Sequence, residues 1–456
     1  MYDVLVIGGG PGGYAAAIRS SQLGGKTALV EADEVGGTCV NRGCIPTKIW
    51  MRAAALLHQI RQADAFGIKA AVEKVEPQTI VARKDGVAAE IRNGMKYLLQ
   101  DNGITLVPGR AVLKNPREAT VNGQTIQAGK IILAMGSRPA VPDIPGLMGA
   151  VNSEQAVGWT EIPSSLLVWG PEYTAVEMAA CLNIFGSHVT LVTPEKRILP
   201  KEDRETRNRV SQALKARGIK ILTECRLEAV QKSGNGFVST LSGSKQETLE
   251  TAQILLCSRR PNTTDMGIES LGVARDENGF IRVNDRLESN VEGLYAIGDV
   301  TGGWMLSHAA SAMGVTAAEN AMGRKNRFPF HLVPRGLWTC PEVAAVGLSE
   351  EEAKEQGYKV KTGGFPYSIN GWAMACGEVD GGVKIVTEEG SGDVLGVHIV
   401  GAGATELIGE AVMAMQFECG ADELAHSIRM HPTFSECIMD AGRDASAWAL
   451  YLPRSR

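Results

Sequence analysis

Two cysteines near the N-terminus have the spacing and the surroundings of a redox-active pair. Cys39 and Cys44 lie within the segment 37–48, near the start of a predicted helix. A helix N-terminus lowers the pKa of a nearby thiol, and the cations of Arg42 and Lys48 add to this effect. Two such thiols can close a small loop as a disulfide and exchange with other thiols. The segment therefore predicts thiol–disulfide chemistry.

A zinc site is the alternative interpretation of this pair. Zinc sites require a second pair of cysteine or histidine ligands at a similar spacing. The other seven cysteines of the chain are isolated from one another in the sequence. We therefore expect no metal site, and we interpret those seven cysteines as buried core thiols.

His431 and Glu436, near the C-terminus, form a second group of residues able to do chemistry. An imidazole is a common general base near neutral pH, and a carboxylate close to it orients the ring and raises its basicity. The pair is therefore a candidate base with its orienting group. From spacing alone, a structural histidine is the more typical interpretation.

A glycine fingerprint at the N-terminus predicts the element that positions this chemistry. The pattern Gly8-x-Gly10-x-x-Gly13 follows a β-branched and aliphatic run at residues 4–7 and opens a helical stretch. Glu31 then ends the next strand, where a carboxylate can accept hydrogen bonds from a ribose. In a chain with 53 glycines the pattern alone is weak, but its strand–turn–helix context predicts a dinucleotide-binding unit.

The same order of elements occurs a second time in the chain. A strand-like run at residues 165–169 leads into Gly170-Pro171-Glu172-Tyr173, an apolar helix, and a returning strand at residues 188–192. Two units of this kind predict two nucleotides bound side by side.

Composition excludes several other classes of protein. The chain has 456 residues, 44% hydrophobic and 21% charged, which is typical of two to four globular domains. Its net charge is −5, with 5% aromatic residues and no basic block, so we expect no nucleic-acid partner. No apolar run approaches the ~18 residues of a membrane helix, and no leader precedes the first strand. We therefore expect no membrane partner and a cytoplasmic location.

Taken together, the motifs resemble those of the pyridine nucleotide–disulfide oxidoreductases, and within that family most closely the dihydrolipoyl dehydrogenase branch. The resemblance covers essentially the whole chain. The motifs that carry it are residues 8–13 with Glu31, 37–48, 134–139, 295–299, 341–347 and 431–436.

The resemblance implies an α/β fold with two Rossmann-like dinucleotide-binding domains, for FAD and NAD, and a C-terminal α+β dimerisation domain. The expected divisions are the first part of the FAD-binding domain at 1–147, the NAD(P)-binding-like domain at 148–265, the return of the FAD-binding domain at 266–334, and the dimerisation domain at 335–456. The residues expected to bind FAD are Gly8, Gly10, Pro11, Gly12, Gly13, Glu31, Gly37, Thr38, Gly43, Lys48, Gly136, Gly298, Asp299, Met305, Leu306 and His308.

The resemblance also implies roles for the catalytic residues. Cys44 is expected against the flavin, and Cys39 is expected to be the interchange thiol that meets the substrate. Lys48 and Glu177 match the family's ion pair beside the reactive flavin nitrogen, where a fixed positive charge stabilises the reduced ring.

His431, oriented by Glu436, is implied to act as base and acid toward the dithiol. In this family it comes from the other subunit of a homodimer. The implied substrate is a dithiol or disulfide, such as that of a lipoyl carrier protein.

The second dinucleotide site departs from the family pattern. Glu172 occupies the middle glycine position, where a carboxylate adds bulk and negative charge near a pyrophosphate. Thr193 stands where NAD-using members have an acidic residue, and Ser258 replaces another glycine. We expect weakened NAD binding unless Glu172 turns to solvent or pairs with a cation such as Arg259. The residues expected at this site are Gly170, Glu172, Tyr173, Glu177, Thr193 and Ser258.

The function predicted from the sequence is oxidation of a dithiol through a Cys39–Cys44 disulfide and FAD, with NAD⁺ as the acceptor. One alternative is a related reductase whose NAD site is lost or retuned toward another electron partner or substrate. The other is a non-catalytic flavoprotein that uses the thiol pair as a redox sensor.

Overall fold

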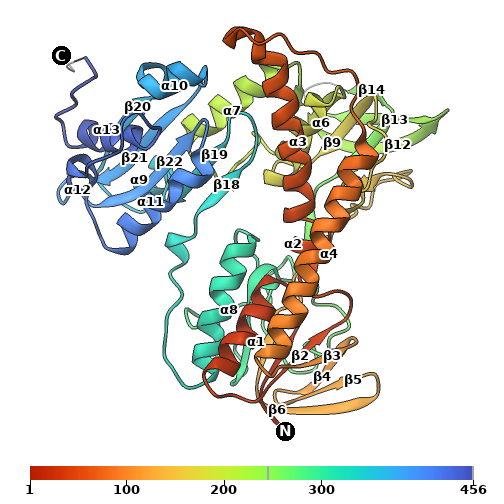
Figure 1. Ribbon diagram of the computed structural model, residues 1–456. Coiled ribbons are helices and arrows are strands. Elements are labelled where there is room, and N and C mark those ends of the chain that lie inside the picture. The colour runs from red at the N-terminus through yellow and green to blue at the C-terminus, as the bar shows by residue number, and fades with distance from the viewer. Residues whose placement is uncertain (244–245, 454–456) are drawn as a thin grey trace.

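The N-terminal domain is built on a mixed sheet, and it belongs to a computed structural model that describes residues 1–243 and 246–453 (Figure 1). Its strands run in the order β3-β2-β1-β6-β5-β4, and β17 pairs with β6. Residues 4–7 of β1 are buried because parallel strands flank them on both sides. The strands are β1 (Tyr2–Ile7), β2 (Thr27–Glu31), β3 (Thr105–Pro108), β4 (Ala111–Asn115), β5 (Glu118–Val121), β6 (Gln124–Leu133) and β17 (Leu294–Ala296).

A tight glycine turn joins β1 to helix α1 (Pro11–Gln22). A Cβ atom at Gly13 would lie 1.7 Å from the carbonyl oxygen of Gly8. Gly8 itself has φ +104°, and a Cβ there would lie 2.3 Å from the carbonyl oxygen of Ala134. Only glycine fits at both positions, so α1 starts directly against the carboxyl end of the sheet.

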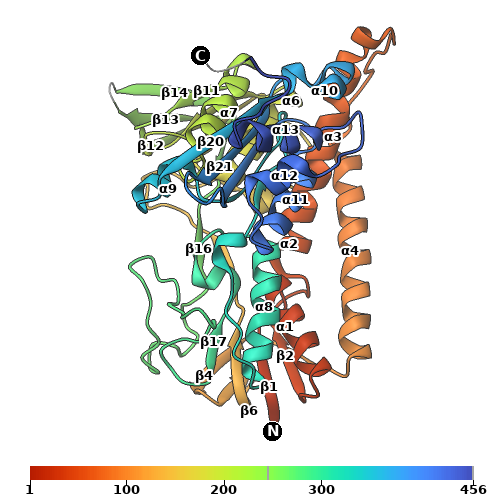
Figure 2. The same ribbon diagram turned by 90° about the vertical axis from the view of Figure 1, so that its left-hand side faces the viewer.

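Two long helices form a hairpin that runs along one side of the molecule (Figures 1 and 2). The short helix α2 (Gly37–Asn41) leads into α3 (Cys44–Gln62), and after η1 (Ala63–Phe66) the chain returns as α4 (Pro77–Asp101). The buried face of α3 includes Trp50, Met51 and Leu57, which share a core cluster with α6 (Tyr173–Ile184) of the second domain. The hairpin therefore ties the first two domains together.

The second domain repeats the parallel arrangement in the order β11-β10-β9-β15-β8 and adds an antiparallel sheet, β12-β13-β14. The pair formed by β7 (Ser137–Pro139) and β16 (Arg259–Pro261) connects it to the first domain. Its remaining elements are β8 (Val151–Asn152), α5 (Ser153–Ala156), β9 (Ser165–Trp169), β10 (His188–Val192), α7 (Arg204–Ala216), β11 (Lys220–Leu222), β12 (Arg226–Ser233), β13 (Gly236–Ser242), β14 (Glu247–Thr251) and β15 (Gln253–Leu256).

The chain then returns to the first domain before it enters a third. The return carries η2 (Gly298–Thr301) and α8 (Ser307–Ala321), which packs on α1. The third domain is an antiparallel sheet in the order β18-β19-β22-β21-β20, covered by helices. Its elements, after η3 (Phe330–Leu332), are β18 (Arg335–Leu337), β19 (Val343–Gly347), α9 (Glu350–Glu355), β20 (Val360–Pro366), η4 (Tyr367–Ile369), α10 (Gly371–Cys376), β21 (Gly382–Glu388), β22 (Val394–Val400), α11 (Ala404–Gln416), α12 (Ala421–His426) and α13 (Glu436–Ala445).

The predicted fold class is confirmed, with two Rossmann-like units and a C-terminal α+β domain. Among the helices of the described residues, none combines the length and the hydrophobicity required to cross a bilayer.

Candidate active site

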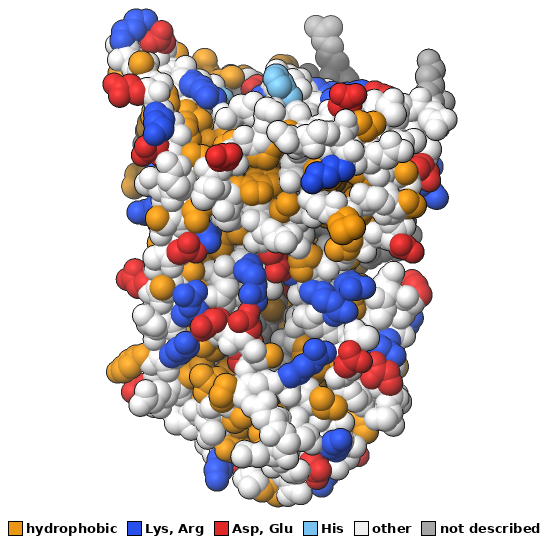
Figure 3. Space-filling model, turned by 90° about the vertical axis from the view of Figure 1, so that its right-hand side faces the viewer, with side chains coloured by type: hydrophobic (Ala, Val, Ile, Leu, Met, Phe, Trp, Pro, Cys, Tyr) orange, Lys and Arg blue, Asp and Glu red, His pale blue; other side chains and the backbone are white. Residues whose placement is uncertain are grey.

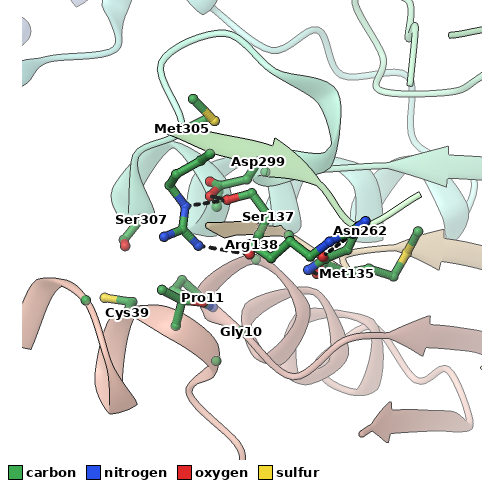
Figure 4. A pocket seen from close by; sticks show the side chains of 18 of the residues that line it. Gly10, Pro11, Cys39, Met135, Ser137, Arg138, Asn262, Asp299, Met305 and Ser307 are labelled. Atoms are coloured by element: carbon green, nitrogen blue, oxygen red, sulfur yellow. Dashed lines mark hydrogen bonds between the residues drawn. The ribbon is translucent and has the colours of Figure 1, made fainter. Parts of the chain in front are cut away.

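One cavity of about 1010 Å³ brings the predicted cofactor and thiol residues together. It lies between the first two domains, and the face drawn in Figure 3 is hollowed at mid-height with basic and acidic side chains around the hollow. Its volume lies at the upper end of the ~300–1,000 Å³ of ordinary ligand sites. Figure 4 shows Ser307 close to Cys39 at one end of the cavity, with Pro11 beside Cys39 and Met305 above.

The end of the cavity near β1 has the donors and acceptors of a dinucleotide site. Glu31 accepts hydrogen bonds from the backbone N–H groups of Gly9 at 2.6 Å and Asp33 at 2.7 Å. No side chain caps the N-terminus of α1, so its first N–H groups are available to a phosphate. The backbones of Gly37 and Gly10 lie close together, and a Cβ at Gly37 would be 2.8 Å from the Cα of Gly10. Because both residues are glycines, no side chain fills this end of the cavity. These features fit the pyrophosphate and ribose of FAD.

Almost all residues predicted to bind FAD line this cavity. Gly13 does not line it but packs behind the turn, against Gly8. The lining residues are Gly8, Gly10, Pro11, Gly12, Glu31, Gly37, Thr38, Gly43, Lys48, Gly136, Gly298, Asp299, Met305, Leu306 and His308.

The two cysteines of the redox loop also line the cavity and differ in acidity. Cys39 lies in α2, and Cys44 is the first residue of α3. A hydrogen bond with the Cys39 thiol, followed by Ser307 and the Lys48 ammonium, lowers the pKa of Cys44 to about 6 against the opposing effect of burial. The same hydrogen bond, with burial, raises the pKa of Cys39. In the reduced pair, Cys44 is therefore the thiolate and Cys39 the thiol near neutral pH.

A buried carboxylate fixes the cation beside the thiols. Lys48 Nζ lies 3.0 Å from both oxygens of Glu177, whose side chain is 8% exposed. The backbone N–H of Trp338 donates to the same carboxylate at 3.0 Å, and the Trp338 ring lies 4.1 Å from Lys48 Nζ. Three elements from three domains thus hold one ammonium group at the wall of the cavity.

The predicted base and its orienting group are adjacent, but they do not line the cavity that holds the thiols of their own chain. His431 Nδ1 lies 2.9 Å from Glu436 Oε1, and the backbone N–H of Thr433 donates to the other oxygen of Glu436 at 2.9 Å. The His431 side chain is 78% exposed and is absent from the lining of the cavity. Within one chain, this pair and the cysteines therefore do not form a single site.

The second dinucleotide unit opens onto the same cavity. Gly170, Glu172, Tyr173 and Ser258 line it, as does Glu177.

Thr193, expected at the same site, is not part of the lining. Its side chain is fully buried, and its hydroxyl accepts a hydrogen bond from the backbone N–H of Glu195 at 3.1 Å. Thr193 therefore faces the protein interior and cannot contact a ribose from this position.

Glu172 lies at the N-terminus of α6, in the middle position of the fingerprint. Its backbone is extended at φ −90°, which any residue adopts, and its side chain does not cap the helix. Burial raises the pKa of the Glu172 carboxyl, and Lys201 opposes that effect. The Glu172 side chain thus brings an ionisable carboxyl group to the wall of the nucleotide cavity.

Pairing of Glu172 with Arg259, one of the two arrangements that would have spared NAD binding, does not form. The Arg259 guanidinium donates to the Ser137 hydroxyl at 2.8 Å, to the Ser137 carbonyl at 2.9 Å and to Glu154 at 3.0 Å. Ser137 in turn donates to Asp299 at 2.6 Å. Arg259 is thus used to connect the two domains.

Two residues at this site were not among those predicted. Ser307 Oγ lies 3.0 Å from Cys44 Sγ, and Trp338 contacts Lys48. Ser307 lies between Leu306 and His308, which were both predicted to bind FAD, so the sequence indicated the segment but not the residue. Nothing in the local sequence marks Trp338.

Two dinucleotide-binding units that share a cavity with a thiol–thiolate pair define the class of flavoprotein disulfide oxidoreductases. The chain belongs to the pyridine nucleotide-disulphide oxidoreductase family. Residues 2–314 match the family itself, and residues 333–441 match its dimerisation domain. It is an FAD-dependent oxidoreductase acting on a sulfur group, and members of the family use FAD and NAD(H).

Similar proteins cover the whole chain. A protein named dihydrolipoyl dehydrogenase from Thermus scotoductus is 41% identical over 99% of both chains. One of the same name from Chlamydia muridarum is 36% identical over 100% of this chain and 99% of its own. The crystal structure of LpdA from Mycobacterium tuberculosis has a TM-score of 0.89 at 26% identity and covers 97% of this chain and 99% of its own.

Proposed function

We propose that this protein is a dihydrolipoyl dehydrogenase, which oxidises the dithiol of a lipoyl group with NAD⁺ as the acceptor. The observation that carries the proposal is the thiol–thiolate pair Cys39–Cys44 on the wall of a cavity that both dinucleotide units share. The full-length similarity to proteins named dihydrolipoyl dehydrogenase supports the choice of substrate. The cytosol remains our predicted location.

The chain's own residues account for the sulfur chemistry. His431 takes the proton from one substrate thiol, and the resulting thiolate attacks Cys39 Sγ of the Cys39–Cys44 disulfide. The S–S bond breaks, and its electron pair leaves on Cys44 as the thiolate. The second substrate thiol loses its proton to solvent, and its thiolate attacks the substrate sulfur of the mixed disulfide. The bond between that sulfur and Cys39 breaks, the oxidised ring closes, and Cys39 leaves and takes the proton held by His431.

FAD, held by the glycine turn at Gly8–Gly13 and by Glu31, would supply a two-electron carrier between the reduced cysteines and NAD⁺. Lys48 supports this step as a fixed positive charge, which Glu177 orients.

We further propose that His431 acts in the site of the partner subunit of a homodimer. Its high exposure and its absence from its own chain's cavity support this arrangement. Ile428, 97% exposed, and Met430, 79% exposed, precede it and offer apolar surface to a partner. The match of residues 333–441 to the family's dimerisation domain supports the same conclusion.

Anaerobic absorbance spectra of the FAD-loaded protein test the proposed activity. Dihydrolipoamide is expected to bleach the flavin band, and NAD⁺ is expected to restore it. Flavin reduction by dihydrolipoamide without any response to millimolar NAD⁺ would favour the reductase with another electron partner. No reduction by any dithiol would favour the redox sensor.

We propose that Glu172, which lines the cavity, weakens NAD(H) binding at the second site. This position of Glu172 favours the reductase with a retuned NAD site as the second candidate function. Because its backbone is extended, replacement by glycine removes charge and bulk without relieving strain. We expect Glu172→Gly to tighten NADH binding about ten- to hundredfold, from the repulsion between a carboxylate and a phosphate at intermediate dielectric. Fluorescence titration with NADH measures the change.

Two further variants separate the causes. Glu172→Gln removes only the charge, so a partial gain is expected. Glu161→Gln removes an exposed carboxylate of the same domain that does not line the cavity, and the NADH affinity of this variant should match that of the wild type. If Glu172→Gly binds NADH no better than the wild type, the electrostatic argument is wrong.

A further inference from the structure

Helix α8 brings a hydroxyl group to the thiol of the redox loop. Ser307 Oγ lies 3.0 Å from Cys44 Sγ, although 263 positions separate the two residues in the sequence. Ser307 is the first residue of α8 and lies close to Cys39 at one end of the cavity (Figure 4). The packing of α8 on α1 sets this distance, because it holds the N-terminus of α8 at the redox loop.

The charge on sulfur determines the direction of this hydrogen bond. A thiolate has no proton and can only accept, so beside the Cys44 thiolate the Ser307 hydroxyl must donate. A hydrogen bond to an ionised partner is roughly twice as strong as one between neutral groups. The contact is therefore worth more to the thiolate than to the thiol.

The other groups that face Cys44 leave this role to a neutral donor. Those that titrate are Cys39 from α2, Lys48 from its own helix and Glu177 from α6. The Lys48 ammonium is paired with both oxygens of Glu177 at 3.0 Å, and these two side chains act on the pKa of Cys44 in opposite directions. The Cys39 thiol is the other neutral donor to Cys44, but it is bonded to the substrate sulfur once the disulfide has opened, which leaves the Ser307 hydroxyl as the neutral donor.

We propose that Ser307 is a catalytic residue whose hydroxyl donates to Cys44 Sγ and stabilises it as the leaving thiolate when the Cys39–Cys44 disulfide opens. The inference rests on the proposed function for the opening of that disulfide. A substrate sulfur bonds to Cys39, the Cys39–Cys44 bond breaks, and the electron pair stays on Cys44. Ser307 keeps its own proton throughout and contributes only the hydrogen bond.

Titration of Cys44 in a Cys39→Ser background tests the proposal. The Cys44 thiolate beside FAD gives a long-wavelength charge-transfer band, and its amplitude against pH reports the pKa of Cys44. Adding Ser307→Ala is expected to raise that pKa by about one unit, the size of one hydrogen bond to a charged group. Ser307→Thr keeps the hydroxyl and should hold the pKa near that of the parent.

Ser311→Ala is the matched control, because it removes a hydroxyl one turn further along α8 that bonds to Pro11 rather than to Cys44. It should leave the titration unchanged. Equal FAD content and equal thermal melting of the variants exclude a folding defect. The pH dependence of Cys44 alkylation by iodoacetamide, in the same variants without FAD, provides a second readout.

An unchanged pKa in the Ser307→Ala variant, or an equal rise in the Ser311→Ala variant, would overturn the proposal. Neither readout uses a lipoyl substrate or NAD⁺. Failure of the proposed activity would therefore leave this result intact, and the two outcomes remain distinguishable.

Discussion

We expect the Cys44→Ser variant to lose dithiol-dependent reduction of NAD⁺ by a factor on the order of 10⁴ or more, because serine cannot form or release a disulfide. The same variant should lack the long-wavelength band of a thiolate beside FAD. The Cys39→Ser variant should be as inactive but should keep that band, because the thiolate of the pair is Cys44. Steady-state assays and absorbance spectra of both variants measure the two effects.

A third cysteine variant controls for the loss of a thiol as such. Cys376 is the last residue of α10, in the third domain, and is absent from the lining of the cavity. Cys376→Ser should therefore retain wild-type turnover and spectrum. A Cys44→Ser protein that keeps the band would show that the roles of the two thiols are reversed.

The FAD half of the site was predictable because its geometry is local in sequence. Contact between Gly13 and the Gly8 carbonyl lies within one turn of chain, so the glycine spacing alone requires the close approach. Glu31 is placed by the parallel register of β1 and β2, which the alternation of strand, helix and strand already implies. Contacts between residues this close in sequence can be specified by a short motif.

The features that sequence reasoning missed depend on contacts between distant segments. Ser307 meets Cys44 only because α8 packs on α1, and Trp338 meets Lys48 only because β18 of the third domain packs on α6 of the second. Thr193 was assigned to the nucleotide site by its position at a strand end, but the turn after β10 directs its hydroxyl to the Glu195 N–H. Side-chain direction at a strand end follows from the next turn, which no motif specifies.

The partner of Arg259 illustrates the same difficulty for charges. A free guanidinium near Glu172 would be expected to pair with it, but Arg259 is held by Ser137 and Glu154. The partner of an ion pair depends on which carboxylate the packed domains bring close to the guanidinium. Closeness within a sequence motif therefore does not determine that partner. The nicotinamide half of the site is therefore the part for which the structure changed the interpretation most.

The proposed location of His431 in the partner's site predicts which mixed dimers are active. His431→Ala homodimers should lose about 10²- to 10⁴-fold in dithiol oxidation, the usual contribution of a general base. A heterodimer of one Cys44→Ser chain and one His431→Ala chain, purified through two different affinity tags, contains one complete site if the histidine acts in trans. It should therefore recover about half of the wild-type rate, as expected from two equivalent sites in a symmetric dimer.

For the complementary heterodimer we expect the opposite result. Comparing the two dimers shows whether any partial activity comes from a histidine that acts in the partner's site. When both substitutions are on one chain and the other chain is wild type, each site lacks either Cys44 or the partner's histidine, so this dimer should be inactive. If His431 instead acted on its own chain, the second heterodimer would have about half the wild-type rate and the first would have none. Because the two dimers contain the same residues in different combinations, only the origin of the histidine can separate their rates.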